Sequence, residues 1–377
     1  MTTVDLPGTG SHLLREPLAL PAGPAPVGRT VFAAAHVVAD PLGHNAPGAP
    51  AAVDWESTLA FRHHLWSLGL GVADAMDTAQ RGMGLDWAAT AELIRRSGAE
   101  ARAVGGRLAC GVGTDQLSAP AALDEVRAAY AQQLEVVEDA GAQPILMASR
   151  ALAATARGPQ DYLDVYGELI EQAGRPVILH WLGEMFDPAL AGYWGSADLD
   201  AATDTVLSLI REHADRIDGI KVSLLDAGRE VALRRALPDG VRLYTGDDFH
   251  YPELIRGDEL GHSDALLGVF DPIAAVAAAA LRALDTGDLA AYDALFAPTL
   301  PLARHLFAAP TFHYKTGIVF LAWLAGHQSH FTMVAGAQSG RSVPHLIELF
   351  RLADRAGVLP DPDLAAQRMS SFLAVSL

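Results

Sequence analysis

The sequence is almost without lysine. It holds 27 basic side chains, yet lysine occurs only at Lys221 and Lys315, and the other 25 are arginine. Arginine replaces lysine at little cost on an exposed surface, so a chain that avoids lysine keeps it where arginine cannot serve. An amine can lose its proton and attack a carbonyl carbon, whereas a guanidinium stays protonated. The two lysines are therefore the first candidates for chemistry.

Cysteine, net positive charge and long apolar runs are also scarce. The single Cys110 excludes an internal disulfide framework, and its apolar neighbours in RLACGVG indicate a core residue. A net charge of −18 argues against a nucleic acid or an anionic membrane as partner. No apolar run reaches about 18 residues, and the N-terminus lacks a basic start followed by an apolar stretch. These absences predict a soluble, cytoplasmic protein.

Short apolar runs recur at regular intervals from residue 30 onward, and their near-continuous apolarity is typical of strands buried on both faces of a parallel sheet. Helical patterns separate most of them; residues 55–69 and 123–141 both end in glycine, and residues 227–237 suffice for about two turns. Such alternation predicts a (β/α)8 TIM barrel, with a doubly wound sheet as the alternative. The expected strands lie in residues 30–39, 71–77, 107–113, 144–149, 176–181, 219–224, 241–246 and 265–270.

Three parts of the chain differ in composition. Residues 1–29 are rich in glycine and proline and predict an N-terminal arm that is laid over the surface or partly disordered. Residues 30–270 hold the barrel, which is the expected catalytic domain. Residues 271–377 carry helical periodicity and predict a C-terminal helical extension packed on the barrel.

Lys221 lies inside the apolar strand pattern of residues 219–224. Alternation along a strand places Ile220, Val222 and Leu224 on one face and Lys221 and Ser223 on the other. If the second face lines the barrel, low solvation lowers the pKa of the amine and prepares it to form a Schiff base with a carbonyl substrate. The structural alternative is a lysine that reaches to the barrel mouth or pairs with an acid.

The chain resembles the dihydrodipicolinate synthase and N-acetylneuraminate lyase family of class I aldolases, as a divergent branch. GIKVSLLD is similar to the family's sixth strand, which places its Schiff-base lysine at Lys221. FHYKTGIVFLAWLAG is similar to its C-terminal helix, with Lys315 at the position of that helix's lysine. The resemblance also covers GRLACGVGT, MGLDWAATAELI and RLYTGDDFHYPELIRGDELGHSDALLG. It implies a Schiff-base aldolase, lyase or hydro-lyase that needs no cofactor and forms a dimer or tetramer.

Two departures from the family pattern bear on the substrate. The Gly-Thr-Thr-Gly-Glu of members that act on pyruvate, which holds the keto-acid carboxylate, is replaced by DTAQR at residues 77–81, which keeps Thr78. The Tyr-Asn that usually ends the fifth strand is replaced by His180 and Trp181. We therefore expect Schiff-base chemistry on a sugar-derived ketone or keto-acid, with pyruvate as a poor substrate.

Polar residues at predicted strand ends supply the other site candidates, because barrel active sites assemble there. His180 is the expected proton shuttle, with a structural histidine as the alternative. Asp247 and Asp248 can accept substrate hydroxyls, although one of them is expected to cap the next helix. Arg81 and Arg150 follow predicted strands and can clamp a carboxylate or phosphate. The predicted substrate-binding set is Thr78, Arg81, Arg150, Trp181, Glu184, Ser223, Asp247 and Asp248.

Two other functions stay open at this point. The first is a metal-dependent barrel isomerase or hydrolase, because His327 and His330 could join His313 or His250 at a metal. No carboxylate completes the spacing of a known metal site, so we expect no catalytic metal. The second is a non-catalytic member that binds a metabolite, because lost signature residues can mean lost chemistry.

Overall fold

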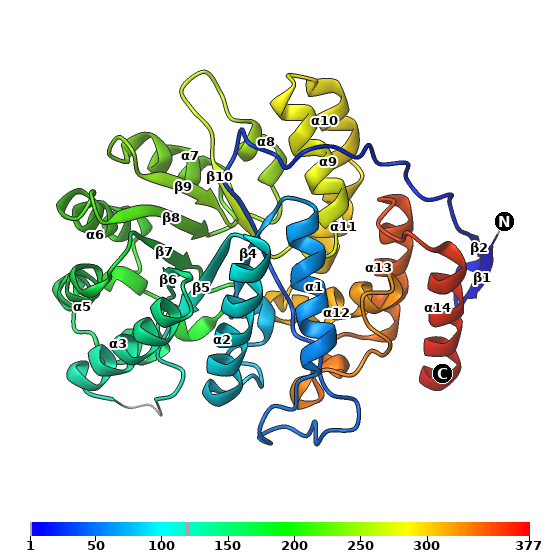
Figure 1. Ribbon diagram of the computed structural model, residues 1–377, viewed down its shortest axis with the longest axis horizontal. Helices are drawn as coiled ribbons and strands as arrows, with labels where there is room; N and C mark the ends of the chain where they lie inside the picture. The colour runs from blue at the N-terminus through cyan, green and yellow to red at the C-terminus, as the bar shows by residue number, and fades with distance from the viewer. Residues whose placement is uncertain (1, 118–120) are drawn as a thin grey trace.

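Eight parallel strands close into a barrel in the computed structural model, which describes residues 2–117 and 121–377 (Figure 1). The strand order is β10-β3-β4-β5-β6-β7-β8-β9, so each strand pairs with its neighbours in the chain and the last strand pairs with the first. This is the predicted (β/α)8 barrel. The strands are β3 (Val31–Ala34), β4 (Gly71–Asp74), β5 (Leu108–Val112), β6 (Gln143–Leu146), β7 (Val177–Leu182), β8 (Ile217–Ser223), β9 (Arg242–Thr245) and β10 (Asp264–Leu267).

Most of the strands are shorter than the apolar runs that predicted them. β4 ends at Asp74, whereas the apolar run continues to residue 77, and β3 ends at Ala34 within the run 30–39. Apolarity reports burial, and the chain stays buried for a few residues after its ladder hydrogen bonds end. The segments just beyond the strands are therefore enclosed, and they hold the candidate site.

Side chains fill the barrel interior, which is a packed core and not a channel. Small residues alternate with large ones, so the layers interdigitate. Space for a ligand is thus left at the carboxyl ends of the strands. The interior residues are Phe32, Ala34, Ala73, Met76, Ala109, Ile145, Met147, Ile178, Tyr244 and Leu266.

Helices surround the barrel, and the predicted ones are present. The helices predicted at 55–69 and 123–141 are followed by Gly69 and Gly141, whose φ angles of 83° and 75° favour glycine. The helices between strands are α1 (Trp55–Ser67), α2 (Trp87–Val104), α3 (Leu123–Asp139), α4 (Arg150–Thr155), α5 (Pro159–Gln172), α6 (Leu199–Glu212), α7 (Ala227–Ala236) and α8 (Tyr251–Arg256).

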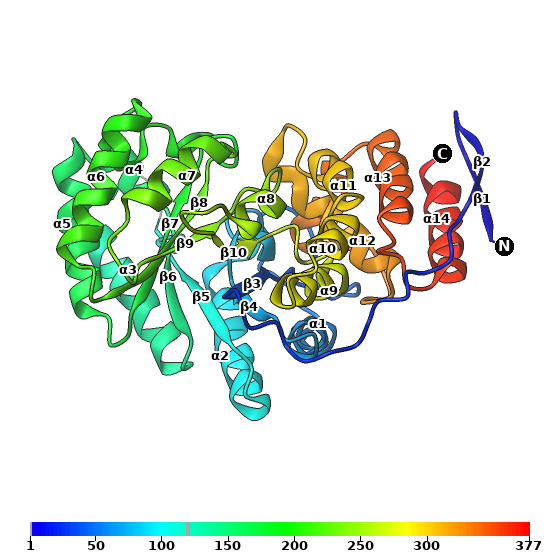
Figure 2. The same ribbon diagram turned by 90° about the horizontal axis from the view of Figure 1, so that it is seen from above.

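The C-terminal segment adds helices at one side of the barrel (Figures 1 and 2). α9 follows β10 and so completes the alternation of strands and helices. The later helices form a separate group beside the barrel, and the start of α12 reaches back to the strand ends, as shown below. These helices are α9 (Ala274–Asp285), α10 (Leu289–Phe296), α11 (Thr299–Leu306), α12 (Tyr314–Leu324), α13 (Val343–Arg355) and α14 (Pro362–Ser376).

The N-terminal arm contains a hairpin that the sequence did not predict. β1 (Thr3–Leu6) and β2 (Gly10–Leu13) pair antiparallel beside α14, at the far end of the C-terminal helices (Figure 2). His12 Nε2 lies 3.0 Å from an Asp354 carboxylate oxygen on α13. Contacts with distant helices hold the hairpin, and a local sequence pattern does not encode such contacts. Within residues 2–117 and 121–377, no helix is both long and apolar enough to cross a membrane.

Candidate functional site

Lys221 projects into the carboxyl end of the barrel. Ile220 and Val222 pack outward in the main core, whereas Lys221 and Ser223 line a pocket, as the strand alternation predicted. Gly246, which directly follows the neighbouring strand β9, lies close to the Lys221 side chain. A Cβ at Gly246 would lie 2.9 Å from the Lys221 Cε carbon. The glycine of the TGDD stretch therefore leaves room for the lysine side chain.

The pocket around Lys221 is small, about 20 Å³, and we call it the inner pocket. Its walls come from loops after several strands and from α12, which is the usual construction of a barrel active site. Of the residues predicted to be in the site, it brings together Lys221, Ser223, Thr78 and Asp248. Its lining residues are Met76, Asp77, Thr78, Leu182, Phe186, Lys221, Ser223, Asp248, Gly268 and Tyr314.

The Lys221 amine loses its proton more readily than an exposed lysine does. Burial lowers the pKa of Lys221, and the carboxylates of Asp77 and Asp248 offset only part of this effect. No residue within the described parts of the chain accepts a hydrogen bond from Nζ. A buried lysine without a hydrogen-bonded partner is rare, and its lone pair is available for attack on a carbonyl carbon.

The two neighbouring aspartates after β9 have different roles. One Asp248 oxygen accepts a 2.9 Å hydrogen bond from the Val269 amide, and the carboxyl lines the inner pocket. Burial raises the pKa of Asp248 to about 7. Asp247 instead accepts hydrogen bonds from the Phe249 and His250 amides and lies 2.9 Å from His250 Nδ1. Asp247 thus fixes the turn into α8, and the structure does not bring it to the inner pocket.

Thr78 forms the opposite wall together with a residue from α12. Its hydroxyl lies 2.9 Å from the Tyr314 hydroxyl. Tyr314 stacks on Phe307 with ring centroids 4.4 Å apart, and Phe186 meets Tyr314 edge-on at 6.3 Å. Tyr314 and Phe186 line the inner pocket, and Phe307 supports the Tyr314 ring.

His180 lies below the inner pocket and does not line it. The backbone of His180 pairs with that of Lys221 across the β7–β8 ladder, and the His180 Nε2 is 3.4 Å from the Ser223 hydroxyl. Burial, with the Lys221 charge, keeps the pKa of His180 well below its usual range, so the ring is neutral. Nδ1 has no hydrogen-bond partner within the described residues. His180 can therefore reach the pocket only through Ser223.

A second, larger space of about 300 Å³ adjoins the inner pocket, and we call it the outer pocket. Asp77 and Leu182 line both pockets and mark their junction. Arg150 lies on its wall, and its Nε donates a 2.5 Å hydrogen bond to Asp187. The Arg150 side chain is 55% exposed, so its guanidinium can still meet a ligand. The outer pocket can hold the part of a substrate that is remote from Lys221.

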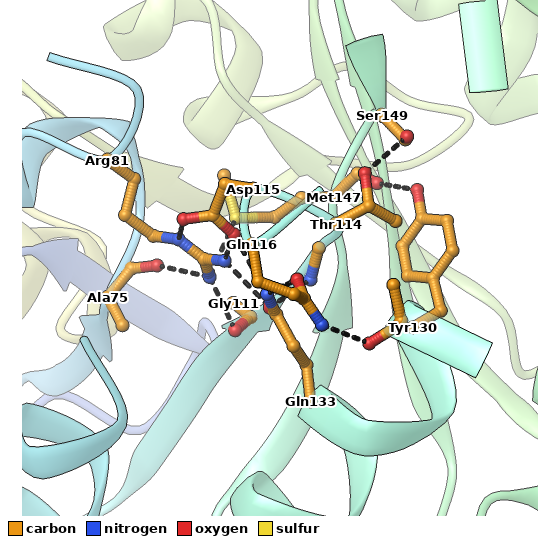
Figure 3. A network of polar contacts seen from close by, with 12 residues as sticks. Ala75, Arg81, Gly111, Thr114, Asp115, Gln116, Tyr130, Gln133, Met147 and Ser149 are labelled. Atoms are coloured by element: carbon orange, nitrogen blue, oxygen red, sulfur yellow. Dashed lines mark hydrogen bonds and ion pairs between the residues drawn. The ribbon is translucent and has the colours of Figure 1, made fainter. Parts of the chain in front are cut away.

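Arg81 also borders the outer pocket, but its hydrogen-bonding capacity is used within the protein (Figure 3). It forms an ion pair with Asp115 and donates to Gln133 at 2.7 Å. It also donates to the carbonyl oxygens of Ala75 and Gly111 at 3.1 and 2.8 Å. Burial alone would raise the pKa of Asp115, yet the Arg81 charge and hydrogen bonds lower it. Arg81 therefore serves as an anchor for the loop after β4.

Two predicted residues lie elsewhere. Trp181 points outward from β7 and packs against Trp194, with ring centroids 6.5 Å apart. Glu184 is exposed in the loop after β7 and borders a separate depression together with Trp181. Strand alternation explains the first case, because His180 and Trp181 are adjacent and cannot both face the barrel interior.

The histidines considered for a metal are distributed over different contacts. The His327 and His64 rings are tilted relative to each other with centroids 4.5 Å apart, and His250 faces Asp247. Across residues 2–117 and 121–377, no group of three or more His, Cys, Asp or Glu side chains is arranged to hold a metal ion.

Sequence reasoning missed Asp77 and Tyr314 as site residues. Asp77 was visible as the residue in DTAQR that stands at the first glycine of the family pattern. Tyr314 adjoins Lys315, which the resemblance places at the position of the lysine in the family's C-terminal helix. Its contact with Thr78 joins residues 236 positions apart, and no local pattern indicates such a pairing.

A family model described as "Protein of unknown function (DUF993)" matches residues 9–376. The chain belongs to this family. No curated protein matches the chain.

Solved structures with the same fold are dihydrodipicolinate synthase family members. The dihydrodipicolinate synthase of Aquifex aeolicus matches with a TM-score of 0.66 and 12% identity, over 88% of this chain and 98% of its own. A prophage protein of the dihydrodipicolinic acid synthase family from E. coli K12, in complex with pyruvate, matches at 0.66 and 14%, over 88% and 99%. The Bacteroides thetaiotaomicron enzyme matches at 0.63 and 13%, over 91% and 99%. The predicted resemblance is thus confirmed at the level of the fold.

Proposed function

We propose that the protein is a Schiff-base lyase that makes or breaks a carbon–carbon bond in a small polyhydroxylated carbonyl compound. The observation that carries this proposal is Lys221, a buried amine with lowered pKa, no hydrogen-bond partner within the described residues, and a pocket before it. The fold shared with dihydrodipicolinate synthases agrees with this assignment. The inner pocket is too small for a whole substrate, and the adjoining outer pocket has room for the rest of it.

The reaction begins when Nζ of Lys221 attacks the substrate carbonyl carbon. The carbonyl oxygen leaves as water, and a protonated iminium forms. The hydroxyl on the β-carbon, two carbons from the iminium carbon, then loses its proton. The bond between the α- and β-carbons breaks, and the electron pair of that bond moves into the enamine. An aldehyde departs. Protonation of the enamine carbon and hydrolysis of the iminium release the second product and restore the lysine.

Asp248 is the group that we assign to proton transfer. It lines the pocket beside Lys221, and its pKa of about 7 lets it accept and return a proton near neutral pH. His180, which the sequence suggested for this task, lies behind Ser223. We assign it the positioning of the Ser223 hydroxyl.

Reductive trapping tests the proposal. Incubation with small hydroxylated ketones and sodium borohydride should add the mass of the reduced ketone to the wild-type protein. Lys221→Arg should give no adduct, because a guanidinium cannot form the iminium. A wild-type protein that gives no adduct with any ketone would favour the non-catalytic binder. Loss of activity on chelation, with rescue by one metal ion, would favour the metal-dependent alternative.

A further inference from the structure

Asp77 places a carboxylate next to Lys221 that is not bound by another side chain within the described residues. The residue is half-buried and lines both pockets at their junction. Its charge acts on Lys221 more strongly than that of Asp248 does. Within residues 2–117 and 121–377, its side chain forms no ion pair and accepts no hydrogen bond.

The loop that carries Asp77 is fixed on both sides. Arg81 donates to the Ala75 carbonyl at 3.1 Å, and the Gln80 side chain donates to the Val334 carbonyl at 3.0 Å. Ala75 and Gln80 have φ angles of 53° and 65°, which residues with a Cβ rarely adopt. Such a conformation persists only where the surroundings enforce it. The loop backbone that carries Asp77 at the pocket wall is therefore preformed.

Neither arginine near the site neutralises Asp77. The Arg81 donors are taken by Asp115, Gln133 and two carbonyls, and Arg150 pairs with Asp187 in the outer pocket. Lys315 acts electrostatically on Asp77, but it lines neither pocket, and its Nζ donates to the Phe312 carbonyl at 3.3 Å. The cation within the inner pocket is Lys221 itself.

This charge pattern discriminates between carbonyl substrates. An α-keto acid bound to Lys221 would place its carboxylate beside Asp77 and Asp248, where like charges repel and the lining of the inner pocket offers no cation besides the iminium itself. A hydroxyl at the same position would instead donate a charge-assisted hydrogen bond to Asp77. We propose that Asp77 makes the inner pocket selective for α-hydroxy ketones and excludes α-keto acids. This inference rests on the Schiff-base function proposed above.

Borohydride trapping with two small ketones tests the role of Asp77. Dihydroxyacetone is the α-hydroxy ketone, and pyruvate is the α-keto acid. The wild-type protein should reach half-maximal adduct with dihydroxyacetone at a concentration about tenfold or more below that for pyruvate. Asp77→Asn keeps the shape of the side chain and removes the charge. In that variant, the pyruvate concentration that gives half-maximal adduct should fall by about tenfold, and the dihydroxyacetone concentration that gives half-maximal adduct should rise.

Asp226→Asn is the matched control. Asp226 follows β8, on the same side of the barrel as Asp77. It is exposed, it lines neither pocket, and it caps α7 by accepting a hydrogen bond from the Arg229 amide. Asparagine caps a helix as well as aspartate does, so this variant should keep the wild-type ratio of the two ketones. An unchanged ratio in Asp77→Asn, or wild-type preference for pyruvate, would overturn the role of Asp77 and leave the Schiff base intact. If neither ketone were trapped at Lys221 at saturating concentration, the Schiff-base function itself would fall, and this inference with it.

Discussion

The two lysines of the chain are both buried, but their surroundings differ. Lys221 on β8 faces a pocket with two carboxyl groups, and within the described residues its Nζ has no hydrogen-bond acceptor. Lys315 on α12 donates to the Phe312 carbonyl, and its Nζ lies 4.8 Å from the centre of the Tyr314 ring. Burial lowers the pKa of both, to about 8 for Lys315. A lowered pKa alone therefore does not distinguish a reactive amine. Lys221 differs from Lys315 because it lines the inner pocket, where a substrate carbonyl can reach it.

The largest expected effect separates these two lysines. Lys221→Arg should reduce turnover by about 10⁴-fold or more, because a guanidinium cannot form the iminium in the inner pocket. Lys315→Met keeps the length of the side chain and should retain adduct formation, with a modest change in the free energy of unfolding. Steady-state kinetics and reductive trapping of both variants provide the measurement. Equal losses of adduct in both variants would contradict the distinction.

The next effect concerns the carboxyl group beside Lys221. Asp248→Asn should lower kcat by about 10²–10⁴-fold, because it removes a positioned acid–base group. The raised pKa of Asp248 means that its carboxylate form is lost as pH falls through about 7. The wild-type kcat should therefore decline below that pH, and the variant should lack this decline. His180→Ala should cost less, since His180 reaches the pocket only through Ser223.

A His180 variant with a larger loss of kcat than Asp248→Asn would reverse these assignments. An acidic decline of kcat that persists in Asp248→Asn would show that another group carries the proton. Trapping of an adduct in both variants serves as the control for an intact inner pocket.

The smallest effects concern the two arginines of the outer pocket and appear in stability. Arg81→Met removes the buried cation that pairs with Asp115, which keeps the hydrogen bond from the Gln133 amide, and should lower the free energy of unfolding by about 3–5 kcal/mol. Arg150→Met removes a pair with a 55% exposed arginine and should cost at most about 1 kcal/mol. Urea unfolding of both variants at neutral pH measures the difference. Equal stability of the two variants would show that the Arg81 network is not structural.

Much of the fold could be predicted from the sequence because strands buried on both faces are apolar at nearly every position. The facing of Lys221 and Ser223 also followed from strand alternation. The same rule, applied to His180 and Trp181, would have shown that only one of them faces inward. Local patterns predict strands and the facing of their side chains because both depend on residues that are neighbours in the chain.

The rest of the site depends on contacts between distant segments. The sequence shows two adjacent aspartates, but only the turn into α8 decides that Asp247 binds backbone amides and Asp248 lines the pocket. The sequence position of Arg81 suggests a ligand clamp, whereas in the structure Asp115 and Gln133 accept hydrogen bonds from its guanidinium. Charged residues in a sequence do not show whether their partners lie within the protein or must be supplied by a ligand.

The most direct test of the central claim is to map the borohydride adduct to a residue. The chain offers only two lysines and its α-amino group to a carbonyl compound. After trapping with dihydroxyacetone and proteolysis, tandem mass spectrometry should place the added mass on Lys221, in the peptide that contains residues 217–223. An adduct on Lys315, or one confined to the α-amino group, would contradict the account.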